Sequence, residues 1–212
     1  MEFKNAEQAF EYYYNHIMDK GVDYNGTKSL FNIGFNILSP MDNSVNTNWR
    51  KWKPDYAEYE WEWYLSGDPN ADAIAERARI WGTMQDSNGN VNSNYGYQWQ
   101  RSNQLDKVID LLKKDKFSRK ASISLYDGKE IDLYSKDTIC THAINFQILD
   151  NKLNMSVMMR SNDLVYGFCN DQYCFSKLQE MVSKELNIEI GSYYHFANNL
   201  HIYERHYNLK NK

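Results

Sequence analysis

The feature that most constrains this chain is a pair of apolar segments, residues 143–149 and 153–159, separated only by Asp150-Asn151-Lys152. The segments have the composition of β-strands and the short polar stretch is typical of a tight turn, so we predict an antiparallel hairpin. Cys140 lies just before the first strand, and Arg160 lies directly after the second. Because a hairpin brings its two outer ends together, any fold built on it places Cys140 close to Arg160.

A thiol beside a guanidinium group is a chemically meaningful pair. A neighbouring cation lowers the pKa of a thiol, and the thiolate is the nucleophilic form. We therefore interpret Cys140 as a candidate nucleophile, against the alternative that it is only a small buried hydrophobic residue. The three cysteines include no Cys-x-x-Cys pair and the five histidines show no metal-ligand spacing, so neither a disulfide framework nor a metal site is expected.

Helical and strand patterns are interspersed along the rest of the chain. Helices are predicted at residues 6–18, 56–65, 72–80, 105–112 and 174–186, strands at 29–38, 121–126 and 200–203, and a loop at 86–97. There is no internal repeat, no low-complexity linker and no regular βαβ alternation. We therefore predict an α+β fold in a single domain over residues 1–212.

Charge and hydropathy restrict the classes of function. The formal net charge of −4 gives no overall basic field for nucleic acid. No run approaches the roughly 18 apolar residues that cross a bilayer, and the N-terminus lacks an apolar signal core. We expect a cytoplasmic protein (host cytoplasm if it is viral) with neither a nucleic-acid nor a membrane partner. The 15% aromatic content suits a pocket built from rings, although core packing explains most aromatic residues.

Several short motifs resemble, in order, those of the thymidylate synthase superfamily. They are Glu60-Trp61-Glu62-Trp63-Tyr64-Leu65, Ile80-Trp81, Asn94-Tyr95-Gly96-Tyr97-Gln98-Trp99, Ser118-Arg119-Lys120, Cys140, the hairpin turn, Arg160-Ser161-Asn162-Asp163 with Gly167, and His201-Ile202-Tyr203. The resemblance covers roughly residues 23–206. It implies a mixed sheet packed with helices, with one sheet face used to form a homodimer.

Two departures from the family pattern concern the base of the nucleotide. Cys140 is followed by Thr141 instead of His, and Asp171 stands where the family has the Asn that reads the base. An amide complements uracil, whereas a carboxyl group that holds a proton complements the N4 donor and N3 acceptor of cytosine. These segments resemble the phage deoxycytidylate 5-hydroxymethyltransferases. The alternative for Asp171 is a helix N-cap, which also suits its place before a predicted helix.

The resemblance implies a folate-dependent C5 hydroxymethyltransferase acting on dCMP. Cys140 would add to C6 of the pyrimidine, 5,10-methylenetetrahydrofolate would supply the one-carbon unit, and water would complete 5-hydroxymethyl-dCMP. Glu60 would organise water and proton transfer, with Tyr95 in the proton relay. The remaining folate contacts implied by the resemblance are Trp81, Asp163 and Gly167. For Trp81 and Tyr95 the alternative is an ordinary place in the aromatic core.

The same resemblance implies how the rest of the nucleotide is held. Arg160 and Ser161 would bind the phosphate, together with Arg119 and Lys120 from the other subunit of the dimer. The N-terminal phosphate-binding arginine of the family is missing near Tyr24, and Lys28 is its candidate replacement. His201 and Tyr203 would reach the sugar 3′-hydroxyl. For each of these residues the alternative is an ordinary surface or strand-end polar side chain.

Other functions stay open at the level of sequence. A dCMP methyltransferase or a thymidylate synthase differs only in the nucleotide or in the last step, where hydride replaces water. A non-catalytic nucleotide- or RNA-binding relative is a further possibility, although binding alone needs neither Cys140 nor Glu60. The chain ends nine residues after Tyr203, whereas the family usually continues into a tail that closes over folate, so how folate is enclosed stays open.

Overall fold

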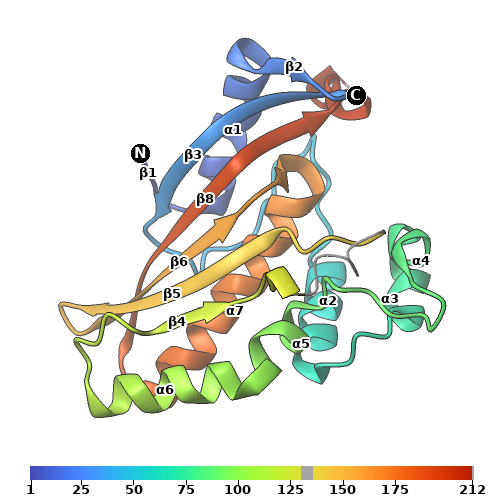
Figure 1. Ribbon diagram of the computed structural model, residues 1–212. Coiled ribbons are helices and arrows are strands. Elements are labelled where there is room, and N and C mark those ends of the chain that lie inside the picture. Colours follow the sequence, from blue (N-terminus) through green and yellow to red (C-terminus); the bar gives the residue numbers. More distant parts are fainter. Residues whose placement is uncertain (130–135, 212) are drawn as a thin grey trace.

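A twisted mixed sheet organises the protein, as the computed structural model of residues 1–129 and 136–211 shows (Figure 1). Within these residues the strand order is β1-β3-β8-β6-β5-β4, with β2 added to β3 and β7 to β8. The strands are β1 (Glu2–Phe3), β2 (Val22–Tyr24), β3 (Thr27–Ile37), β4 (Ser122–Ser124), β5 (Thr141–Leu149), β6 (Lys152–Met159), β7 (Asn162–Asp163) and β8 (Glu189–Tyr203). Because β6 and β8 pair in parallel while β3–β8 and β5–β6 pair antiparallel, the predicted α+β class is confirmed.

Two long helices lie behind the sheet in Figure 1 and pack on it. Helix α1 contacts β3 and β8, and α7 contacts β6 and β8. The helices are α1 (Ala6–Lys20), α2 (Pro54–Ser66), α3 (Asp72–Arg77), α4 (Ile80–Met84), α5 (Tyr95–Gln100), α6 (Gln104–Lys114) and α7 (Cys169–Leu186). A five-residue π-helix, η3 (Leu164–Phe168), leads directly into α7. Helices α2 to α5 lie together at the open end of the hairpin in Figure 1, where α2 also packs on α7.

The predicted hairpin is present and closes as expected. Asp150 and Asn151 have φ angles of 49° and 59°, the left-handed region that a two-residue turn of this kind requires and that Asp and Asn tolerate. Lys152 is already the first residue of β6, so the turn is one residue shorter than predicted. At the open end the Arg160 backbone N–H donates to the Cys140 carbonyl oxygen at 2.8 Å, which confirms the predicted proximity of the two residues.

Element boundaries differ from the predictions where polar residues interrupt an apolar pattern. The strand predicted at 200–203 is only the end of the fifteen-residue β8. Its buried interior includes His195, which hides the apolar alternation. The predicted loop 86–97 ends earlier, because the Asn94 side chain caps α5 by accepting from the Tyr97 N–H. The helix predicted at 72–80 is two helices, and the strand predicted at 121–126 keeps only three residues.

The two faces of the sheet differ in burial. Side chains of β8 alternate, with Tyr193, His195 and Ala197 buried against the helices and Tyr194 and Phe196 half-buried on the opposite face. The predicted use of a sheet face in a homodimer concerns this second face and stays a prediction.

Candidate active site

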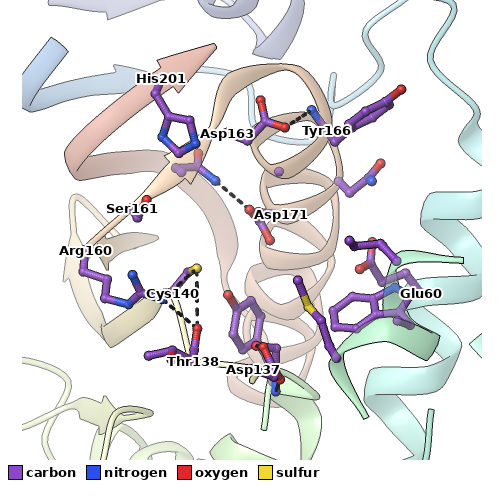
Figure 2. A pocket seen from close by; sticks show the side chains of 18 of the residues that line it. Glu60, Asp137, Thr138, Cys140, Arg160, Ser161, Asp163, Tyr166, Asp171 and His201 are labelled. Atoms are coloured by element: carbon purple, nitrogen blue, oxygen red, sulfur yellow. Dashed lines mark hydrogen bonds between the residues drawn. The ribbon is translucent and has the colours of Figure 1, made fainter. Parts of the chain in front are cut away.

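A cavity of about 440 Å³ opens where the hairpin end, the end of β8, the start of α7 and helices α2, α4 and α5 meet. Most of the predicted site residues line it, namely Glu60, Trp81, Tyr95, Cys140, Arg160, Ser161, Asp163, Gly167, Asp171, His201 and Tyr203. In Figure 2, Cys140 and Arg160 stand at one side, Glu60 at the other, and Asp171 between them. Residues separated by more than a hundred positions therefore share one pocket.

The Cys140 thiol and the Arg160 guanidinium are neighbours at the hairpin end. Arg160 Nη2 lies 3.5 Å from Cys140 Sγ and also donates to the Thr138 carbonyl oxygen at 2.8 Å, while its Nε donates to the Ile139 carbonyl oxygen at 2.9 Å. Burial nevertheless raises the pKa of Cys140 to about 11, and the opposing effect of Arg160 is smaller. The expectation that Arg160 brings the thiol pKa below its usual value is therefore wrong, because desolvation of the thiolate outweighs the cation. The thiol needs a group that removes its proton.

Glu60 is a buried acid with an unsatisfied oxygen. It is 5% exposed, and Oε1 accepts from the Tyr64 hydroxyl at 3.4 Å, while Oε2 meets no hydrogen-bond partner among the residues that the structure describes. Burial first, and then the charge of Asp171, raise the Glu60 pKa to about 8. An acid that titrates near neutral pH and has a free oxygen in a pocket is suited to proton transfer.

Asp171 points into the cavity from the first turn of α7. Its Oδ2 accepts from Asn162 Nδ2 at 2.7 Å, marked by a dashed line in Figure 2. The helix runs on from η3 and its capping residue makes no side-chain hydrogen bond, so Asp171 is not an N-cap. Burial raises the Asp171 pKa to about 7, against the lowering effect of the Asn162 hydrogen bond. The carboxyl group is therefore available in its neutral form near pH 7.

Asp163 and Gly167 have structural roles beside the cavity. Asp163 caps η3, since its Oδ1 accepts from the Val165 N–H at 2.9 Å and its Oδ2 from the Tyr166 N–H at 3.4 Å. A Cβ at Gly167 would lie 2.8 Å from Asn162 Nδ2, so only glycine leaves room for that amide. These contacts explain both residues without a ligand, and their predicted contact with folate stays a prediction.

Three of the predicted phosphate ligands do not line this cavity. Lys28 pairs with Asp23 at 3.4 Å. Arg119 and Lys120 are exposed in the segment between α6 and β4. The predicted role of Lys28 as a phosphate ligand stays a prediction, as does the prediction that Arg119 and Lys120 serve a partner's pocket. His201 and Tyr203 are adjacent at the rim, with ring centroids 5.1 Å apart.

Several residues that line the cavity were missed from the sequence, and Asn162, Asp137 and Tyr56 are among them. Asn162 was noted only as part of a motif, Asp137 holds the Ser93 N–H at 2.6 Å and the Ser93 hydroxyl at 2.7 Å, and the Tyr56 hydroxyl accepts from Trp81 Nε1 at 2.9 Å. Asp137 and Tyr56 stand in no recognisable pattern, and only their distant contacts identify them. Asn162 had one signal in the sequence, its place in the Arg160-Ser161-Asn162-Asp163 motif, whereas its contact with Asp171 is seen only in the folded chain.

Residues 1–129 and 136–211 contain no cluster of three His, Cys, Asp or Glu side chains that could hold a metal ion. No helix among them is long and apolar enough to cross a membrane.

Comparison with known proteins agrees with this geometry. The thymidylate synthase family profile matches residues 8–212. The chain is 35% identical over 173 residues to the deoxycytidylate 5-hydroxymethyltransferase of Enterobacteria phage T4, which covers 73% of this chain and 69% of the phage protein. It is 32% identical over 174 residues to the thymidylate synthase of Mycoplasma pneumoniae, covering 81% of this chain and 59% of that protein. Thymidylate synthase 1 of Bacillus amyloliquefaciens is 27% identical over 184 residues, 80% of each chain.

The family match spans nearly the whole chain, and the relatives include both hydroxymethylating and methylating enzymes at similar identity. The mixed sheet, the Cys140–Arg160 pair at the hairpin end and the acid-lined cavity agree with that match. The protein belongs to the thymidylate synthase family of folate-dependent one-carbon transferases that act on C5 of pyrimidine nucleotides.

Proposed function

We propose that this protein is a deoxycytidylate 5-hydroxymethyltransferase, which converts dCMP to 5-hydroxymethyl-dCMP with 5,10-methylenetetrahydrofolate. The observation that carries the proposal is the half-buried carboxyl group of Asp171, which faces the cavity, accepts from Asn162 Nδ2 at 2.7 Å and has its pKa raised to about 7. The similarity of the chain to the deoxycytidylate 5-hydroxymethyltransferase of phage T4 supports the same nucleotide and the same product.

The proposed recognition of cytosine uses both oxygens of Asp171. Cytosine offers an amino donor at N4 and an acceptor at N3. A neutral carboxylic acid donates from its hydroxyl to N3 and accepts at its carbonyl oxygen from N4. Uracil offers the opposite pair, an acceptor at O4 and a donor at N3. Because an unmatched buried polar group costs about 1–3 kcal/mol, the base that fits the acid is preferred.

Cys140 is the proposed nucleophile, and its thiolate adds to C6 of the base so that C5 becomes nucleophilic. Since burial raises the pKa of Cys140 to about 11, the thiol loses its proton as it attacks rather than beforehand. Glu60, with its unpaired Oε2, is the proposed acceptor and donor of protons and holds the water that forms the hydroxymethyl group. Tyr95 would assist this transfer from the wall of the cavity.

The cavity has the chemistry that a folate ring needs beside the base. Trp81 and Tyr56 form an aromatic wall joined by a hydrogen bond, and the free Glu60 Oε2 is a polar group for the ring nitrogens. We propose Trp81, Asp163 and Gly167 as its contacts. When bound, 5,10-methylenetetrahydrofolate supplies a one-carbon unit at the oxidation level of formaldehyde.

The proposed assembly is a homodimer in which each phosphate site is shared. Arg160 and Ser161 contribute from one chain, and Arg119 of the partner subunit and Lys120 of the partner subunit complete the site. Lys28 is a weaker candidate for the phosphate because it is paired with Asp23. His201 and Tyr203 are proposed to hold the 3′-hydroxyl of the sugar. One catalytic domain over residues 1–212 and a cytoplasmic location, that of the host for a phage protein, complete the proposal.

The test is to incubate the protein with dCMP, dUMP and CMP in turn, each with 5,10-methylenetetrahydrofolate, and to weigh the products. A hydroxymethyl group on dCMP is the expected result. A methyl group on dCMP or on dUMP would replace the proposal by a methyltransferase or a thymidylate synthase. Nucleotide binding without any release of the C5 hydrogen would indicate a non-catalytic binding protein.

A further inference from the structure

Behind Asp171, three buried polar side chains form a row that leads away from the cavity. Asn162 Nδ2 donates to Asp171 Oδ2 at 2.7 Å, Asn162 Oδ1 lies 3.1 Å from His195 Nε2, and His195 Nδ1 lies 2.8 Å from the Tyr193 hydroxyl. His195 and Tyr193 are both 0% exposed, and neither lines the cavity. Polar groups placed so deep in the core of an enzyme are expensive to bury, so their contact with the base-reading acid calls for a function.

The hydrogen bonds in this row are all donated in one direction, from Tyr193 toward Asp171, and the Tyr193 hydroxyl sets that direction. Among the described residues, His195 Nδ1 is the only hydrogen-bond partner of the Tyr193 hydroxyl. A buried hydroxyl group that found no acceptor would lose a hydrogen bond, so Tyr193 donates and Nδ1 accepts. Burial lowers the pKa of His195 to about 3, which keeps the ring neutral, and its single hydrogen is therefore on Nε2.

The same order of donor and acceptor continues through the Asn162 amide to Asp171. Nε2–H of His195 donates to Asn162 Oδ1, which turns the amide so that Nδ2 faces Asp171. Asp171 Oδ2 is then an acceptor, while Oδ1 makes no hydrogen bond to any described residue. In the neutral acid, the carbonyl oxygen is the better acceptor, so the proton belongs on Oδ1. The missing side chain of Gly167 leaves the space that the Asn162–Asp171 contact needs.

We propose that Tyr193, His195 and Asn162 are positioning residues that select which oxygen of Asp171 carries the proton, and thereby strengthen the preference for cytosine. The inference rests on the proposed function for its nucleotide. With Oδ1–H directed at N3, Oδ2 has one lone pair for N4–H and one for Asn162. Uracil needs the opposite tautomer, in which a protonated Oδ2 accepts more weakly from Asn162.

The first test removes the far end of the row without touching the cavity. Tyr193→Phe deletes only the hydroxyl group, and calorimetry measures the dissociation constants of dCMP and dUMP. Without the Tyr193 hydroxyl, the His195 tautomer and the orientation of the Asn162 amide are no longer fixed. The dCMP-over-dUMP preference is therefore expected to fall about fivefold. Asn162→Ala, which removes the direct contact, is expected to reduce it further. Tyr14→Phe is the matched control, because the Tyr14 hydroxyl is also buried but donates to the His206 carbonyl oxygen.

The second test reads the tautomer of His195 by nitrogen NMR in the protein without nucleotide. A neutral ring with its hydrogen on Nε2 is expected in the wild type, and a mixture of tautomers in Tyr193→Phe. A hydrogen on Nδ1 or a charged ring in the wild type would overturn the inference whatever the substrate. An unchanged preference in both variants, with a wild type that prefers dCMP, would overturn it too. A wild type that prefers dUMP would overturn the proposed function instead. The NMR result alone would then test whether Tyr193, His195 and Asn162 set the position of the proton on Asp171.

Discussion

The two ends of the candidate site are built differently. At the base end, Asp171 is held by Asn162, and the chain of hydrogen bonds continues into the core through His195. At the phosphate end, Arg160 has backbone partners, but the other cations expected there, Arg119 and Lys120, are exposed and outside the cavity. In the proposed function, the base end is formed within one chain, whereas the phosphate end includes cations of a partner subunit. Selectivity for the base would then be a property of the subunit, and affinity for the phosphate is expected to depend on assembly.

The largest expected effect concerns the proposed nucleophile, which lies beside Arg160 at the phosphate end. Cys140→Ser replaces the thiol by a much weaker nucleophile at neutral pH, so turnover should fall below detection, by at least about a thousandfold. Binding of dCMP, measured by calorimetry, should stay within a few-fold of wild type because both ends of the site are kept. Substantial residual turnover would exclude Cys140 as the nucleophile.

The next effect tests the base end by itself. Asp171→Asn replaces the neutral acid by an amide that fits uracil, so preference should move from dCMP toward dUMP. Two contacts of about 1–2 kcal/mol each correspond to a change of roughly 30- to 1000-fold in relative kcat/KM. Competition kinetics with both nucleotides measure the ratio. If the ratio does not change, Asp171 does not read the base.

A smaller effect tests the phosphate end across subunits. Arg119→Ala should weaken dCMP binding by about tenfold through the loss of one charge-assisted hydrogen bond, in a salt-dependent way. At dCMP concentrations well below the dissociation constant of Arg119→Ala, mixing these subunits with inactive Cys140→Ser subunits should raise the activity, because each heterodimer contains one intact site. Subunit exchange is checked by mass spectrometry of the intact dimers. Exchange without recovered activity would show that the phosphate site is not shared.

The smallest effect concerns pH and again separates the two ends. The Asp171 pKa is raised to about 7 and the neutral acid is the form that fits cytosine, so the dCMP affinity of the wild type, divided by that of Asp171→Asn, should be highest below pH 7 and decline above it. Between pH 6 and pH 7 the decline should be about twofold, because about half of the acid loses its proton over that interval. Dividing by the affinity of the variant cancels the titration of the nucleotide phosphate, which both proteins bind. A ratio that does not change with pH would contradict a protonated Asp171.

Local patterns in the sequence determined much of this protein. The alternating apolar residues and the Asp150-Asn151 turn specify the hairpin, and the hairpin alone brings Cys140 to Arg160. The hairpin inference succeeds because strand pairing across a tight turn depends on neighbours in the chain. The position of Asp171 in an ordered set of motifs predicts that it reads the base, through the distinct hydrogen-bonding chemistry of a carboxyl group, and this role stays a prediction.

Only the tertiary structure determined the pKa values of the site residues and the long-range hydrogen bonds that hold them in place. The Asn162–His195 contact joins residues 33 positions apart, and the Ser93–Asp137 contact joins residues 44 apart. The sequence also indicated a lowered pKa for Cys140, whereas the structure raises it to about 11. A cation near a thiol can be predicted from local spacing. The cost of removing that thiol from water depends on everything packed around it, and that packing exists only in the folded chain.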